Sequence, residues 1–131
     1  TILKVNKVWD IALIGVGDLG RAIAHYQGFQ NAGFRITTIF DDDPKKIGQK
    51  IAGFRVEDMK NLGELIRNNG IAIAMLTVPS SAAQGAADEL VKAGIRAILN
   101  YAPITLNVPT SVHVENINPI MELQHMTYYL E

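Results

Sequence analysis

The stretch Ile11-Ala12-Leu13-Ile14-Gly15-Val16-Gly17-Asp18-Leu19-Gly20 decides how this chain folds. It begins as an apolar run that predicts a buried strand, and it ends in three glycines with the spacing G-x-G-x-x-G. Gly15 lets the chain turn sharply, Gly17 leaves room for a phosphate beside the backbone, and Gly20 lets the next helix pack close to the strand. Free N–H groups at that helix start favour an anion, so the stretch predicts a pyrophosphate-binding turn.

The residues around this turn complete the pattern of a dinucleotide-binding unit. A strand is predicted over residues 10–14, and a helix over residues 19–29. A second apolar run predicts a strand at 35–40, which Asp41 follows, about 20 residues beyond the last glycine. An acid at this distance accepts hydrogen bonds from the ribose hydroxyls beside adenine. The alternative is a nucleotide-free turn in which the glycines serve packing alone.

Asp41 is the first of three consecutive aspartates, followed by Asp42 and Asp43. Hard cations bind carboxylates, but side chains at a strand end point in alternating directions and Asp43-Pro44 is typical of a turn, so we predict no metal site. The negative charge would repel a 2′-phosphate, which favours NADH or NAD⁺ over NADPH or NADP⁺. Lys46 either neutralises part of this cluster, lies along the adenosine, or is a solvated surface lysine.

The rest of the chain alternates strands with helices, without an internal repeat. The further strands are predicted at 54–56 (an edge strand), 71–78, 95–99 and 111–114, and the further helices at 59–69, 80–93 and 119–131. This order predicts an α/β fold of the Rossmann type, with a doubly wound, mainly parallel sheet and a ligand crevice at the carboxyl ends of its strands. We expect one NAD(H)-binding and dimerisation domain over residues 9–131, preceded by a remnant of another segment at 1–8.

The composition narrows the classes of function. The chain of 131 residues has no cysteine, which excludes thiol catalysis and Cys-ligated metals and fits a reducing cytoplasm. Twelve basic and thirteen acidic residues give a net charge of −1 without a basic block, so we predict no nucleic-acid surface here. The apolar runs are strand-length, so we predict no membrane span and a cytoplasmic location.

Few side chains offer catalytic chemistry. The histidines at positions 25, 113 and 125 lie on different predicted elements, none in a nucleophile pattern, so we predict no catalytic residue. Asn100, Tyr101 and Ala102 follow the predicted strand 95–99, where the nicotinamide half of a dinucleotide would lie. Tyr101 is then either a stacking ring or an aromatic side chain that packs within its loop.

The predicted C-terminal helix has more apolar surface than one supporting sheet can cover. Its large apolar side chains lie on several sides of the helix rather than along one stripe. We therefore expect the helix to be exchanged between two copies in a homodimer, burying Leu123, Met126, Tyr129 and Leu130. The alternative is a terminal helix with an excess of apolar residues.

Five segments resemble, in order, those of the Rex family of redox-sensing transcriptional repressors. They are residues 12–20 (ALIGVGDLG), 40–48 (FDDDPKKIG), 76–79 (LTVP), 94–103 (GIRAILNYAP) and 122–124 (ELQ). From about Trp9 to its end, the chain is similar to the nucleotide-sensing C-terminal domain of that family. Two residues depart from the family pattern: Asp18 stands where Asn, Arg or Lys is frequent, and Tyr101 where Phe is usual.

The resemblance implies a repressor domain that binds NADH or NAD⁺, dimerises through the exchanged helix and releases operator DNA when NADH binds. It implies operator contact only through an N-terminal winged-helix domain that is missing from this sequence. The candidate nucleotide-binding residues are Gly15, Val16, Gly17, Asp18, Leu19, Gly20, Asp41, Lys46, Thr77, Val78, Pro79, Asn100, Tyr101 and Ala102. Two interpretations as part of an enzyme remain open. They are the cofactor domain of an NAD-dependent dehydrogenase and the CoA-binding domain of an acyl-CoA ligase.

Overall fold

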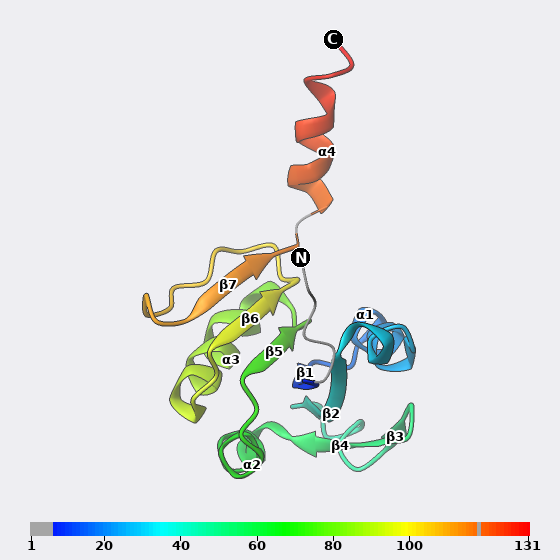
Figure 1. Ribbon diagram of the computed structural model, residues 1–131, viewed down its shortest axis with the longest axis vertical. Helices are drawn as coiled ribbons and strands as arrows, with labels where there is room; N and C mark the ends of the chain where they lie inside the picture. Colours follow the sequence, from blue (N-terminus) through cyan, green and yellow to red (C-terminus); the bar gives the residue numbers. More distant parts are fainter. Residues whose placement is uncertain (1–6, 118) are drawn as a thin grey trace.

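A seven-stranded sheet forms the centre of the computed structural model, which describes residues 7–117 and 119–131 (Figure 1). The strands are β1 (Trp9–Ile14), β2 (Phe34–Asp41), β3 (Lys50–Ile51), β4 (Phe54–Asp58), β5 (Ile73–Leu76), β6 (Ala97–Asn100) and β7 (His113–Asn116). Their order is β3-β4-β2-β1-β5-β6-β7, and all neighbours pair in parallel except β3 and β4. The predicted mainly parallel α/β sheet is therefore confirmed.

Helices cover both faces of this sheet, as the doubly wound prediction requires. The helices are α1 (Asp18–His25), α2 (Leu62–Asn69), α3 (Ser80–Ala93) and α4 (Pro119–Thr127), with short 3₁₀ helices η1 (Gln30–Ala32) and η2 (Met59–Asn61). Alternate residues of β1 belong to two separate cores: Leu13 packs with Ile23 of α1, whereas Ile14 packs with residues of α2 and α3. Because β1 is buried on both faces, it lies at the centre of the fold.

Several predicted boundaries are wrong. The first helix ends at His25 rather than residue 29, because Tyr26 adopts an extended backbone and its ring packs against Phe29 with 4.9 Å between centroids. The predicted edge strand at 54–56 is covered by β3, because a turn at Ala52 and Gly53, both with positive φ, folds the chain back. The last strand begins two residues later than predicted, at His113.

The last helix differs from the others in its surroundings. Figure 1 shows α4 projecting away from the sheet, with the C-terminus at its far end. It ends at Thr127 and not at residue 131. Ile120, Leu123 and Met126 are all more than half exposed, and Tyr129 is 78% exposed. Across the described ranges 7–117 and 119–131, the helices lack the length and apolar character needed to cross a membrane. Residues 1–6 of the predicted remnant lie outside the described residues.

Replacing Gly20 with alanine should destabilise the fold, because α1 packs against the strand turn at this residue. An added Cβ would meet the carbonyl oxygen of Gly15, and it would lie 2.8 Å from the hydroxyl of Thr77. We expect the free energy of unfolding to fall by about 1–3 kcal/mol in urea titrations, the usual cost of overpacking.

Gly85→Ala is the matched control, because a Cβ on this residue of α3 meets no atom within 4 Å. It should raise the free energy of unfolding by about 0.5–1 kcal/mol, the usual gain of alanine over glycine inside a helix. Equal stability of Gly20→Ala and the unaltered protein would contradict the packing role of Gly20.

Candidate functional site

The glycine turn lies between the end of β1 and the start of α1. Gly15 has φ = +96°, a conformation that L side chains rarely adopt, and its N–H donates to the carbonyl of Phe40 at 2.8 Å. Gly17, with φ = −69°, is the residue before α1, and a Cβ placed there would meet nothing within 4 Å. Backbone N–H groups at the start of α1 therefore adjoin open space that an anion can enter.

Two neighbouring strands hold this turn in shape. On one side, the N–H of Val16 donates to Oδ2 of Asp41 at 2.9 Å, which joins the turn to the end of β2. On the other side, the hydroxyl of Thr77 lies 2.8 Å from the carbonyl oxygen of Gly15 and 3.0 Å from that of Ile14, which joins the turn to the end of β5. Protein contacts alone thus hold the buried part of the turn, next to the exposed Gly17.

Asp41 has a second bond that fixes its carboxylate. Its Oδ1 accepts the N–H of Asp43 at 2.8 Å, so each carboxylate oxygen already has one backbone donor. An ionised carboxylate oxygen has room for a further donor. The side chain is held rigidly at the rim of the site, and it can still accept two hydroxyl groups from a ligand.

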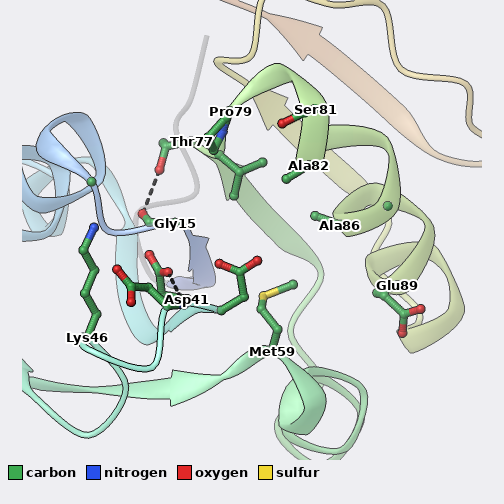
Figure 2. A pocket seen from close by; sticks show the side chains of 15 residues that line it. Gly15, Asp41, Lys46, Met59, Thr77, Pro79, Ser81, Ala82, Ala86 and Glu89 are labelled. Atoms are coloured by element: carbon green, nitrogen blue, oxygen red, sulfur yellow. Dashed lines mark hydrogen bonds between the residues drawn. The ribbon is translucent and has the colours of Figure 1, made fainter.

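A pocket of about 800 Å³ opens beside this turn (Figure 2). The glycine turn and Lys46 lie on one side of it, and Ala82 and Ala86 of α3 lie on the other. Met59, the first residue of η2, points into the space between them. The lining therefore combines apolar side chains with a few charged groups, a combination typical of sites that bind small molecules.

The charges around the pocket are mainly negative. Asp41, Asp42, Asp43 and Glu89 line it, with Lys46 as the one basic residue among the described lining. A ligand with an extra phosphate near Asp41 would meet these carboxylates. Within residues 7–117 and 119–131, three or more His, Asp or Glu side chains do not come together in a way that could hold a metal ion.

Half of the predicted site residues line this pocket. Those that do are Gly15, Gly17, Asp41, Lys46, Thr77, Val78 and Pro79. Those that do not are Val16, Asp18, Leu19, Gly20, Asn100, Tyr101 and Ala102. Val16 is wholly buried and Gly20 is covered by the turn, whereas Asp18 and Leu19 are exposed on α1.

The predicted residues at the end of β6 have different environments, and Ala102 is buried in the core shared with α2 and α3. The side chain of Asn100 is wholly buried and bonded to protein atoms, so it presents no surface to a ligand. Tyr101 is half-buried against the core on the α1 face, and its N–H donates to the carbonyl of Leu76 at 2.9 Å. Burial of the phenol raises the pKa of Tyr101 above its ordinary value of 10.0.

Eight lining residues, most of them on or near α3, are not among the residues predicted from the sequence. The missed lining residues are Asp42, Asp43, Met59, Ser81, Ala82, Gly85, Ala86 and Glu89. Small residues at 82, 85 and 86 share one face of α3 through i, i+3 and i+4 spacing, and this was a readable signal for close approach of a ligand. Met59 had no comparable signal.

Comparison with known proteins identifies one matching domain family and a set of similar transcriptional repressors. The family model described as the CoA binding domain matches residues 6–104. The redox-sensing transcriptional repressor Rex of Chloroflexus aurantiacus is 49% identical over 129 residues, which cover 98% of this chain and 61% of that protein. The chain therefore spans about three fifths of the length of the curated relatives it matches.

Solved structures of RSP, a Rex-family repressor, are similar at 40% identity. The complex with β-NAD⁺ and operator DNA has a TM-score of 0.90 over 97% of this chain and 58% of that chain. The complex with β-NADH has a TM-score of 0.88 over 96% of this chain and 61% of that chain. The likeness extends beyond the sheet order to nearly the whole chain.

The raised pKa of Tyr101 predicts a measurable pH dependence. The folded state holds the phenol proton more tightly than the unfolded chain, so the stabilisation is complete below pH 10.0 and is lost as the pH rises through the folded pKa. The measurement is phenolate absorbance as the pH is raised. Subtracting the curve of Tyr101→Phe from that of the unaltered protein leaves the titration of Tyr101, whose midpoint should lie above pH 10.0. A midpoint at or below that value would contradict the burial of this ring.

Proposed function

The chain belongs to the CoA binding domain family and to the Rex group of redox-sensing transcriptional repressors, and we propose that it is the regulatory domain through which such a repressor senses NADH and NAD⁺. One observation carries the nucleotide part of this proposal: an open glycine turn at the start of α1, bonded to an aspartate that keeps acceptor capacity. That pair suits a pyrophosphate and an adjoining ribose. The RSP complexes with β-NAD⁺ and β-NADH support the same ligand class.

The proposed dinucleotide crosses the carboxyl ends of β2, β1, β5 and β6. Its adenosine occupies the described pocket, with the ribose hydroxyls on Asp41 and the base between Met59 and the small residues of α3. The pyrophosphate lies on Gly17 and the N–H groups of α1. The nicotinamide then extends toward Tyr101, beyond the pocket.

Discrimination between NADH and NAD⁺ has to arise at the nicotinamide, because the rest of the two molecules is the same. The cationic ring of NAD⁺ is disfavoured by apolar surroundings, and each tenfold preference requires about 1.4 kcal/mol. Tyr101 packs with the apolar core on the α1 face, which supplies such surroundings. The carboxylate of Asp18, in the first turn of α1, lowers the affinity for both forms through repulsion of the pyrophosphate.

Sensing also requires a second subunit whose arrangement relative to the first the ligand can change. A ligand shifts an equilibrium between two arrangements only when it binds one of them better. We propose that two copies of residues 9–131 dimerise through α4, with Leu123, Met126, Tyr129 and Leu130 in the interface. All four side chains are more than half exposed in the single chain.

Operator recognition is assigned to a different part of the repressor. RSP is described in complex with operator DNA, and this chain covers 58% of it. The whole chain has a net charge of −1 and lacks a basic block, so it is poorly suited to bind a phosphate backbone. We therefore propose that the full-length protein binds DNA through a separate N-terminal domain, and that it acts in the cytoplasm, where the operator is.

Coenzyme A is the second candidate ligand, because the matching family model bears its name. Its 3′-phosphate would lie beside the ribose, where Asp41, Asp42 and Asp43 line the pocket with only Lys46 to balance them. This charge pattern favours a ribose with two free hydroxyls. Titrations with both kinds of ligand separate the two functions.

The domain should bind NADH more tightly than either NADPH or coenzyme A. A phosphate next to Asp41 would lose the carboxylate–hydroxyl bonds and gain repulsion, so we expect at least a tenfold weaker affinity, equivalent to about 1.4 kcal/mol. Nicotinamide fluorescence measures NADH and NADPH, and competition against NADH measures NAD⁺ and coenzyme A. Equal affinity for NADH and NADPH would remove Asp41 from the site, and preference for coenzyme A would overturn the sensing proposal.

Replacing Gly17 with valine should abolish NADH binding without unfolding the domain. The new side chain would enter the open space assigned to the pyrophosphate, and it would meet no protein atom within 4 Å of its Cβ. Gly63→Val is the matched control, since it adds the same side chain to α2 outside the pocket. Both variants should retain cooperative urea unfolding. Gly63→Val should still change the nicotinamide fluorescence of added NADH, whereas Gly17→Val should leave it unchanged. NADH binding by Gly17→Val with unchanged affinity would mean that the turn does not hold the pyrophosphate.

Removing α4 should convert a dimer into a monomer. Each large apolar side chain buried in an interface contributes about 1.5–3 kcal/mol, and several per helix offset much of the association cost of roughly 4–15 kcal/mol. A chain ending at residue 118 should have monomeric mass by light scattering at micromolar concentration. Leu123→Asp should weaken the dimer, whereas Gln124→Asp adds the same charge at the next exposed position and should not. A dimeric truncated chain, or a monomeric intact one, would contradict this role of α4.

A further inference from the structure

Asn100, at the end of β6, is the one polar residue in the buried core of the part of the chain that the structure describes. Its amide nitrogen donates to the carbonyl of Ile104 at 3.0 Å and to Oδ1 of Asn116 at 3.1 Å. Its Oδ1 accepts the N–H of Ala102 at 3.0 Å. A single wholly buried side chain thus bonds to two residues of the loop 101–104 and to the end of β7.

The backbone adds to this connection. The N–H of Ile117 donates to the carbonyl of Asn100 at 2.9 Å, and the N–H of Tyr101 donates to Leu76 at the end of β5. β7 ends at Asn116 and α4 begins at Pro119. Figure 1 shows α4 apart from the sheet, so within one chain a displacement in the body of the domain reaches this helix by way of the end of β7.

We infer that the side-chain bond between Asn100 and Asn116 transmits a change in the loop 101–104 to α4. The inference rests on the proposed function, because it takes a nucleotide near Tyr101 as the source of the change. A buried amide that loses a partner keeps the full desolvation penalty, so the loop and the end of β7 move together rather than separately. Asn100 and Asn116 are positioning residues, since Asn100 has no exposed surface and Asn116 lies beyond the pocket.

Asn116 is the better residue to change, because it is exposed whereas Asn100 lies in the core. Asn116→Ala removes the acceptor, and Asn116→Ser keeps a polar group that is too short to reach Asn100. Asn116→Asp retains the acceptor oxygen. Glu115→Ala is the matched control on the same strand, since Glu115 is exposed and bonds to His113 at 2.7 Å instead of to Asn100.

Hydrogen exchange of residues 117–127, measured with and without saturating NADH, tests the transmission, and nicotinamide fluorescence confirms NADH binding in every variant. The unaltered chain, Glu115→Ala and Asn116→Asp should each show an NADH-dependent change in exchange of α4. Asn116→Ala and Asn116→Ser should bind NADH and unfold cooperatively in urea but lose that change. A purely structural role for the bond would lower stability and leave the response of α4 in place.

The inference is overturned if Asn116→Ala and Asn116→Ser respond like the unaltered chain, or if Glu115→Ala loses the response as well. It is also overturned if NADH binds to the unaltered chain without any change in α4, and the proposed nucleotide binding then still stands. Absence of NADH binding in the unaltered chain would instead overturn the proposed function and the inference together.

Discussion

The hydrogen bond from the N–H of Val16 to the carboxylate of Asp41 is the constraint on which the site depends. A glycine-rich turn has many accessible conformations, and only a few direct its free N–H groups toward one ligand. Asp41 at the end of β2 and Thr77 directly after β5 select one of them, because each bonds to the turn from the direction of a neighbouring strand. The geometry of the turn is therefore a property of the sheet, and a ligand need not supply the ordering free energy when it binds.

The sequence predicts the parts of the site that are encoded locally. β1, the glycine turn and Asp41 each follow from residues next to them in the chain, and the structure places them together. The small residues at 82, 85 and 86 indicate a face of α3 that a ligand can approach, but the position of that face depends on how α3 crosses the sheet, which the local sequence does not specify. β3 does not follow from the sequence for a different reason: it forms because a non-glycine residue, Ala52, adopts a positive φ.

Asn100 and Tyr101 show why neighbouring residues at a strand end can have different environments. Side chains alternate across a strand, and β6 places Ile98 in the core shared with α2 and α3, whereas Leu99 and Tyr101 pack on the α1 face. Asn100 therefore turns toward β7 and the loop, where its three hydrogen bonds are satisfied. The residues were predicted to line one site, but the alternation separates their side chains.

Because α4 is exposed, its conformation depends on the concentration of the protein in a cell. The helix has nine residues, fewer than the roughly 12–15 at which an isolated helix becomes marginal in water, and its described side chains are exposed. Its helical state must then be stabilised by whatever it docks against. If that surface is a second copy, dilution melts this segment while the sheet stays folded, and expression level sets the fraction of ordered helix. Gene dosage would thus act on the conformation of one helix.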